Sequence, residues 1–269
     1  MNLSRVNKKV AIIAVAKNEQ LYVREWVEHH LDLGFDSIIL ADNDDDFLLP
    51  GIIDYPAVIN ENYCGIDKVQ TLAYTELYKK YRKDFDWLLF IDCDEFVMLD
   101  NQYKDIKDFL QHFDCDEVRI SSKHFSDNDA LDTIGDYRVV ERFRDPYYTS
   151  ADTFVKSFIN TRVELGDRKV YGHGIYDKDL DARNVLNDPC ENTNQHTQRI
   201  VHERCWLNHY PTKTVGEYIR QKYFRGGPNG NPGRYNRWES YFFRTNRKTQ
   251  EKIDYANKLI KEIENGRFD

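Results

Sequence analysis

Three acidic residues follow an apolar run in the first half of the chain. Residues 87–91 (WLLFI) are typical of a buried strand, and Asp92, Asp94 and Glu95 come directly after it. Because successive side chains of a strand point to opposite faces, Asp92 and Asp94 should point the same way. Two carboxylates so placed repel each other unless a cation or a positive ligand group lies between them. Such hard oxygen ligands suit Mg²⁺ or Mn²⁺, which hold diphosphates through a few carboxylates and the substrate's own oxygens.

A solvated acidic turn is the simpler interpretation of the same residues, because acid pairs are common in turns. Here, however, no Gly or Pro separates the acids from the strongly apolar strand. In open α/β sheets the ligand crevice lies outside the carboxyl ends of the strands. The sequence therefore favours a site for a metal-held nucleotide diphosphate at this strand end.

Strands and helices alternate over the first hundred residues. Apolar runs predict buried strands and helical spacing predicts helices, in the order strand 10–16, helix 19–33, strands 37–41 and 57–59, helix 66–82 and strand 87–91. This alternation implies an α/β fold with a mostly parallel, twisted sheet and helices on both faces. Polar residues follow three of the strands, at 17–19, 42–46 and 92–95, and should meet at one edge of the sheet.

The second half is less regular and predicts a mixed sheet followed by helices. Its expected elements are strands at 117–121, 138–143, 153–159 and 169–171, and helices at 103–112, 217–224 and 237–263, the last interrupted or bent near Thr245. Residues 226–233 (GGPNGNPG) predict a turn-rich loop. We expect one α/β domain over residues 1–235 and a helical extension over residues 236–269.

Composition and charge narrow the classes of function. The 269 residues include 38 basic and 46 acidic ones, and the net charge of −8 argues against nonspecific nucleic-acid binding. The five cysteines are scattered without a C-x-x-C pair, which fits free thiols in a reducing compartment. The polar N-terminus and short apolar runs predict neither a signal peptide nor a membrane span. We therefore expect a cytoplasmic protein, for which peripheral association with the inner face of the membrane stays open.

Several segments together carry a family resemblance. Residues 14–19 (AVAKNE), 25–36 (EWVEHHLDLGFD) and 86–96 (DWLLFIDCDEF) occur in this order, and residues 209–214 (HYPTKT) follow later. With Lys222 and the Arg225-Gly226 pair, they resemble the GT-A glycosyltransferases of the family 2 and family 92-like branch, over roughly residues 9–227. The chain departs from the commoner family 2 pattern at residues 42–46, where D-D-G-S is more usual.

The resemblance implies a function as well as a fold. Proteins of this kind move a sugar from a nucleotide diphosphate donor, usually UDP, to a hydroxyl of an acceptor glycan, and they need a divalent metal, commonly Mn²⁺. It implies an inverting hexosyltransferase that acts on a glycan or lipid-linked glycan in bacterial surface polysaccharide synthesis. The alternative is a catalytically inactive module that binds a nucleotide sugar or a glycan. A phosphohydrolase is disfavoured, because Glu95-Phe96 follows Asp94 where Gly-Thr would be needed.

The resemblance also assigns ligands to the metal and the nucleotide. We expect Asp92 and Asp94 to contact the metal, with His209 as the third ligand and His173, flanked by glycines, as its competitor. The residues expected to bind the nucleotide are Ala16, Lys17, Glu19, Asp42, Lys68, Gln70, Lys213, Lys222 and Arg225.

An inverting reaction needs a carboxylate that takes the acceptor's proton. Asp127 and Asp129, which follow a predicted strand, are the candidates, and Asp127 is preferred. An Asp/Asn turn is the ordinary interpretation of the same pair. A packed histidine and a solvated basic helix face are the ordinary interpretations of His209 and of the C-terminal lysines. We also expect the loop at 226–233 to order over the donor and exclude water.

Overall fold

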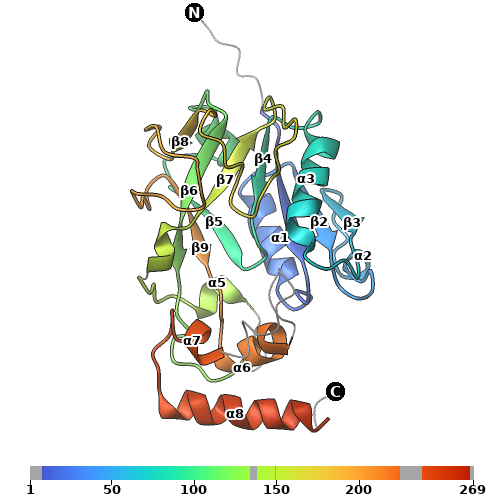
Figure 1. Ribbon diagram of the computed structural model, residues 1–269, viewed down its shortest axis with the longest axis vertical. Coiled ribbons are helices and arrows are strands. Elements are labelled where there is room, and N and C mark those ends of the chain that lie inside the picture. Colours follow the sequence, from blue (N-terminus) through green and yellow to red (C-terminus); the bar gives the residue numbers. More distant parts are fainter. Residues whose placement is uncertain (1–7, 134–137, 149, 225–237, 267–269) are drawn as a thin grey trace, which may run out of the picture. The chain divides into compact units, whose positions relative to one another are not determined.

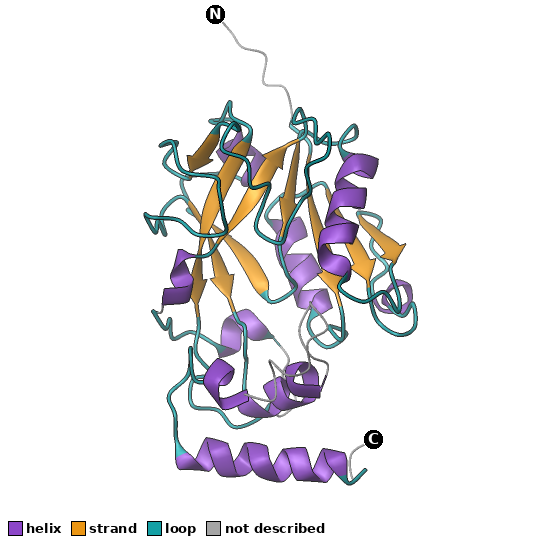
Figure 2. Ribbon diagram, viewed as in Figure 1, coloured by secondary structure: helices purple, strands orange, loops and turns teal. Residues whose placement is uncertain are grey.

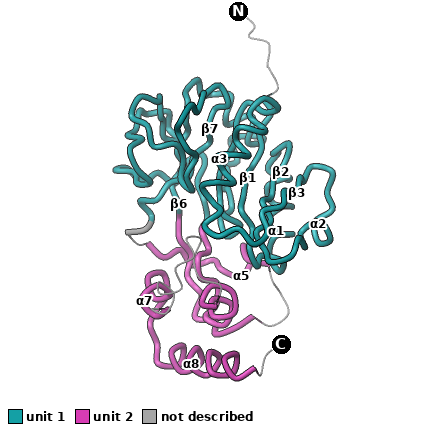
Figure 3. Tube along the Cα trace, turned by 45° about the vertical axis from the view of Figure 1, so that its right-hand side comes forward, with its two compact units in different colours: residues 1–122, 152–208 teal, residues 123–151, 209–269 magenta. Residues whose placement is uncertain are grey.

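The computed structural model describes residues 8–133, 138–148, 150–224 and 238–266 (Figure 1). Two compact units divide the chain: residues 1–122 with 152–208, and residues 123–151 with 209–269 (Figure 3). The expected boundary at residue 235, Arg225 and the loop at 226–233 lie outside the described residues. The predictions made for them therefore stay predictions.

The described strands form one nine-stranded sheet in the order β3-β2-β1-β4-β7-β6-β9-β5, with β8 beside β6 (Figure 2). Their bounds are β1 Val10–Ala16, β2 Ser37–Asp42, β3 Val58–Asn62, β4 Trp87–Phe90, β5 Glu95–Leu99, β6 Glu117–His124, β7 Val155–Asn160, β8 Ala182–Asn184 and β9 Cys205–His209. Strands β1 to β4 pair in parallel, whereas β7 is antiparallel to both β4 and β6. The sheet is therefore parallel where the sequence alternates strands and helices, and mixed beyond β4.

Helices cover both faces of the parallel strands. The helical elements are α1 Val23–Asp32, α2 Leu49–Ile52, α3 Val69–Tyr81, α4 Ile106–Leu110, α5 Val139–Arg142, η1 Ser150–Thr153, α6 Val215–Tyr218, η2 Ile219–Tyr223, α7 Trp238–Phe242 and α8 Gln250–Glu264. Helix α3 packs Tyr74 and Leu77 on Ile13 and Phe90 of the sheet, and α1 lies on the opposite face (Figure 1). The expected class, a Rossmann-like α/β fold with helices on both faces of the parallel strands and helices toward the C-terminus, is confirmed.

The order of the parallel strands reverses between β1 and β4. The chain proceeds outward from β1 to β2 and β3, and then returns through α3 to place β4 on the other side of β1. In open α/β sheets such a switch point leaves a crevice at the carboxyl ends of the two central strands, where ligands bind. The residues after β1, from Lys17, and those after β4, including Asp92 and Asp94, therefore lie where a nucleotide is expected.

Two strands predicted in the second half are wrong. Residues 138–143 form the short helix α5, because Val139 is fully buried and Arg142 turns to pair with Glu217 at 2.8 Å. Tertiary packing here overrides the strand preference of two adjacent valines. Residues 169–171 form no strand within the described part of the chain, and Tyr171 makes only an isolated bridge to Gly174.

Other elements differ in extent from the expected ones. Strand β5 begins at Glu95, and the sequence analysis predicted no strand at these residues. The expected C-terminal helix is two helices, α7 and α8, and α8 begins after Thr249, whose side chain accepts the N–H of Lys252 at 3.3 Å. Such a side-chain cap starts a new helix, so the predicted interruption near Thr245 is confirmed.

Candidate functional site at the carboxyl ends of β1 and β4

Asp92 lies directly beyond β4 and is held from two sides. Its Oδ1 accepts a hydrogen bond from Gln70 Nε2 at 2.7 Å, and its Oδ2 accepts one from Lys156 Nζ at 2.7 Å. Gln70 lies in the first turn of α3, and Lys156 lies on β7. Helix α3 and strand β7 together fix the orientation of the Asp92 carboxylate, which is still 38% exposed.

Lys156 belongs to this side-chain cluster, and the sequence analysis did not identify it. Its side chain is 1% exposed, and its ammonium also lies 3.1 Å from Glu95 Oε2. Burial raises the pKa of the Glu95 carboxyl to about 8, although Lys156 opposes this. The positive charge expected beside these carboxylates is therefore supplied in part by the Lys156 ammonium. A lone lysine within the apolar strand VKSFI was the available signal.

The described residues fit a metal that arrives with a diphosphate. No group of three His, Cys, Asp or Glu side chains among them is arranged to hold a metal ion. Mg²⁺ and Mn²⁺ need only one or two carboxylates when phosphate oxygens and water complete the coordination shell. Asp92 keeps one unused lone pair on each oxygen, since each accepts a single hydrogen bond. Asp94, two residues on and 6% exposed, would supply the second carboxylate.

Two aspartates organise the loops after β1 and β2. Asp42, which is fully buried, accepts the N–H groups of Asp44 at 3.1 Å and Leu49 at 2.9 Å. Asp44 in turn accepts the N–H of Asn18 and the Nε2 of Gln20, each at 2.6 Å. Asp42 therefore shapes the β2 loop and Asp44 joins it to the β1 loop. A direct contact of Asp42 with a nucleotide stays a prediction.

The other residues expected after β1 lie at the same edge of the sheet. The carbonyl of Ala16 accepts the N–H of Asn43 at 2.8 Å, which links the ends of β1 and β2. Lys17 lies 3.8 Å from Asp45, and both side chains are exposed enough for this ion pair to contribute little stability. Glu19 is 6% exposed, and its carbonyl accepts the first N–H groups of α1.

The N-terminus of α3 lies against a glycine turn. Lys68, exposed at the N-cap of α3, adopts a left-handed conformation with φ 54°. A Cβ atom at Gly172 would lie 3.0 Å from Gln70 Oε1, so the turn at residues 171–174 packs on the side chain that holds Asp92. His173 in this turn stacks on Phe154, with ring centroids 5.4 Å apart. The structure thus brings the predicted residues Lys68, Gln70 and Asp92 together.

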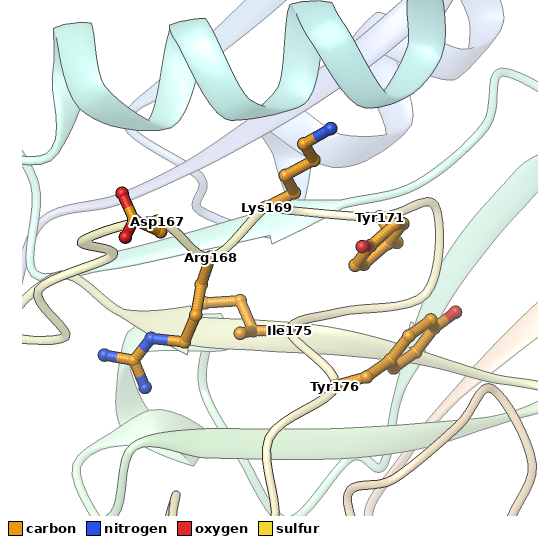
Figure 4. A pocket seen from close by; sticks show the side chains of 6 residues that line it. All are labelled: Asp167, Arg168, Lys169, Tyr171, Ile175 and Tyr176. Carbon is orange, nitrogen blue, oxygen red and sulfur yellow. The ribbon is translucent and has the colours of Figure 1, made fainter.

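A pocket of about 140 Å³ borders this turn at Tyr171 (Figure 4). It is lined by Asp167, Arg168, Lys169, Tyr171, Ile175 and Tyr176. The rings of Tyr171 and Tyr176 are stacked, with centroids 4.9 Å apart and planes 5° apart. Arg168 is held by Asp177 at 2.6 Å, whereas Lys169 is exposed. The pocket therefore combines an aromatic wall with a cationic rim.

The second unit holds the remaining predicted residues that the structure describes. The ring of His209, at the end of β9, lies 4.7 Å from that of His124. Lys213 is 3% exposed, and Lys222 donates to the carbonyl of Pro211 at 2.6 Å. Neither lysine lies on a solvated helix face, so that ordinary interpretation is wrong. Metal binding by His209 and phosphate binding by the lysines stay predictions.

The two candidate bases are both paired with Lys252. Its ammonium lies 2.7 Å from Asp127 Oδ2 and 2.9 Å from Asp129 Oδ1. Asp127 Oδ1 also accepts the N–H of Asp129 at 3.0 Å, which is the expected Asp/Asn turn. Burial raises the pKa of Asp127, although Lys252 opposes this. The assignment of a base stays a prediction, and a base role for Asp127 requires its ion pair with Lys252 to open.

Replacement of Asp127 by asparagine should lower the free energy of unfolding by about 2–3 kcal/mol, because the buried Lys252 then loses its only buried partner of these two aspartates. The control is Asp129→Asn, which should cost less than about 1 kcal/mol, since the Asp129 side chain is 50% exposed. Urea unfolding of both variants measures the difference. Equal losses of stability in the two variants would show that the ion pair of Asp127 with Lys252 stabilises the fold no more than that of Asp129.

Comparisons with known proteins add little to this geometry. No protein-family model and no curated protein matches the chain. Among solved structures, S. aureus TarS aligns at a TM-score of 0.36 and 17% identity, over 43% of this chain and 22% of TarS. The 4-diphosphocytidyl-2C-methyl-D-erythritol synthase of Anaerococcus prevotii DSM 20548 aligns at a TM-score of 0.33 and 15% identity, over 58% of this chain and 73% of the synthase. At these TM-scores neither likeness supports an argument about function.

Proposed function

We propose that the protein is a metal-dependent glycosyltransferase that uses a nucleotide diphosphate sugar, with UDP as the nucleotide. One observation carries the proposal: Asp92 and Asp94 follow β4 at the switch point of the sheet, and Gln70 from the N-terminus of α3 orients Asp92 at 2.7 Å. This is where open α/β sheets bind nucleotides, and the carboxylates suit a cation shared with phosphate oxygens.

Asp92 and Asp94 are the residues that would hold the metal, with His209 proposed as a third ligand. When bound, Mn²⁺ or Mg²⁺ would join the two phosphates and neutralise the charge that develops on the leaving nucleotide. Gln70 and Lys156 keep the Asp92 carboxylate in one orientation, so that little reorganisation is needed when the donor binds. Lys68 stands exposed at the N-terminus of α3, which favours an anionic group.

The transfer step is proposed to invert the configuration of the sugar. The acceptor hydroxyl oxygen forms a bond to the anomeric carbon as the bond to the diphosphate oxygen breaks. The electron pair of that bond leaves with the nucleotide, and the hydroxyl proton passes to a carboxylate. Asp127 or Asp129 is proposed as this base. The nucleotide itself is proposed to contact Ala16, Lys17, Glu19, Asp42, Lys213, Lys222 and Arg225.

The acceptor is proposed to be a glycan or a lipid-linked glycan of a bacterial surface polysaccharide. We propose that the reaction takes place in the cytoplasm, at the inner face of the membrane. No helix in the described part of the chain is long and apolar enough to cross a membrane. Contact with a lipid-linked acceptor would then be peripheral.

A donor screen by thermal unfolding with Mn²⁺ tests the proposal. Only nucleotides that bind the folded chain raise its melting temperature, by mass action. We expect UDP and one or a few UDP-sugars to raise it, and CDP and GDP at equal concentration to have smaller effects. No shift with any nucleotide diphosphate, with or without metal, would overturn the proposal.

An inactive nucleotide-sugar or glycan-binding module is the second candidate. Two sets of ion pairs favour the inactive module. Lys156 pairs with one oxygen of Asp92, and Lys252 pairs with both candidate bases, Asp127 and Asp129. Release of UDP from a panel of UDP-sugars separates the two candidates. A transferase should hydrolyse its donor slowly without acceptor, whereas a donor that binds but is never turned over would favour the module.

A further inference from the structure

Lys156 is placed beside the acidic residues by the register of two antiparallel strands. Phe90 of β4 pairs with Ser157 of β7, so Lys156 lies opposite Ile91, one residue before Asp92. On its other side Lys156 pairs with Ile120 of β6, so it is on an inner strand of the sheet. Pairing of β7 with β4 and with β6 therefore fixes the position of the Lys156 Cα atom.

The side chain of Lys156 carries a charge in a place that excludes water. It is 1% exposed, and a buried ammonium is costly unless anionic groups surround it. Its two partners are Asp92 at 2.7 Å and Glu95 at 3.1 Å, and the Glu95 side chain is only 2% exposed. Glu95 Oε2 also accepts the N–H of Asp92 at 2.9 Å. Lys156, Glu95 and the backbone of Asp92 thus contact one another on the buried side of the Asp92 carboxylate.

We propose that Lys156 is the resident cation of this acidic strand end, and that it excludes a divalent metal from Glu95 and from the inner oxygen of Asp92. A dication placed between Asp92 and Glu95 would lie against the Lys156 ammonium, and two like charges at this distance repel strongly. Of the three acidic side chains after β4, Asp94 and the outer edge of Asp92 then remain for a metal. Two carboxylates hold Mn²⁺ weakly, so the metal binds tightly only together with the diphosphate.

The expectation that the metal binds tightly only together with the diphosphate rests on the proposed function. The exclusion of a metal by Lys156 does not. Replacement of Lys156 by methionine removes the charge and retains an apolar side chain of similar length. Asp92 and Glu95 then lose their shared cation, and Mn²⁺ can take its place. Without any nucleotide, Lys156→Met should bind Mn²⁺ at least about tenfold more tightly than the wild-type chain. Added Mn²⁺ should also raise its melting temperature more than that of the wild type.

Two matched variants separate charge from packing. Lys156→Arg keeps the positive charge, and it should bind Mn²⁺ alone as weakly as the wild type. The double variant Lys156→Met/Glu95→Gln removes the ammonium and the Glu95 carboxyl together, and its Mn²⁺ affinity should return toward the wild-type value. A lysine that only filled space would give a loss of thermal stability that Mn²⁺ does not restore.

The experiment is a titration with Mn²⁺ in the absence of nucleotide. Electron paramagnetic resonance measures the free Mn²⁺, and thermal unfolding measures the melting temperature of each variant. Equal Mn²⁺ affinities of folded Lys156→Met and wild type would overturn the inference. So would tight Mn²⁺ binding by the wild type alone, a result that needs no variant to fold. Binding of UDP to the wild type is measured separately. The glycosyltransferase proposal can therefore fail while the Mn²⁺ titration still decides whether Lys156 excludes the metal.

Discussion

Replacement of Asp94 by asparagine should abolish the Mn²⁺ dependence of UDP binding and lower the rate of sugar transfer by on the order of 10²–10³-fold. The amide keeps the size and polarity of the side chain but removes the negative charge that a hard cation prefers. The effect should be larger than that of Asp92→Asn, because one Asp92 oxygen already binds Lys156.

The matched control is Asp84→Asn, which makes the same chemical change at an exposed position before β4. Calorimetry of UDP binding in Mn²⁺ and in EDTA, with far-UV circular dichroism to confirm folding, compares the two variants. We expect Asp84→Asn to match the wild type in both solutions. An Asp94→Asn variant that is folded and still binds UDP more tightly with Mn²⁺ would show that Asp94 is not a metal ligand.

Glu117 should make the stability of the first unit depend on pH. It is fully buried on β6, and burial raises the pKa of its carboxyl from 4.5 to about 7, although Ser157, Arg119 and Asn192 oppose this. A carboxyl whose pKa is higher in the folded than in the unfolded chain favours folding while it is protonated. Its contribution is therefore complete below pH 4.5 and is lost as the pH rises through about 7.

Glu117→Gln should remove this dependence, because glutamine is neutral at every pH. Between pH 5 and 8 the free energy of unfolding of the variant should fall less than that of the wild type, by on the order of 3 kcal/mol. Urea unfolding at several pH values measures both slopes, and Glu203→Gln serves as an exposed control. Parallel slopes for Glu117→Gln and the wild type would mean that the buried carboxyl does not titrate in this range.

The parallel half of the fold was readable from the sequence because its signals are local. The runs at residues 10–16 and 87–91 are apolar throughout, as strands covered on both faces must be, and polar residues mark their ends. The alternation of strands and helices then predicts parallel β-α-β units, whereas the strand order came from the structure. The strands predicted at residues 138–143 and 169–171 failed because distant side chains, such as Glu217 beside Arg142, decide the local conformation there.

The candidate site was predictable in its acids but not in their partners. Asp92 and Asp94 stand out as charges that end an apolar strand, and their position at the sheet edge is confirmed. Lys156 and Lys252 reach their partners across long stretches of chain, and no local pattern records such a pairing. Asp42 differs again, because its buried carboxylate caps backbone N–H groups of its own loop.

Calorimetric titration of the wild-type chain with UDP, once in Mn²⁺ and once in EDTA, tests most directly whether Asp92 and Asp94 share a metal with the diphosphate. We expect the affinity for UDP to be at least about tenfold higher in Mn²⁺, because phosphate oxygens and two carboxylates then complete one coordination shell. Equal affinities for UDP in the two solutions would contradict the account.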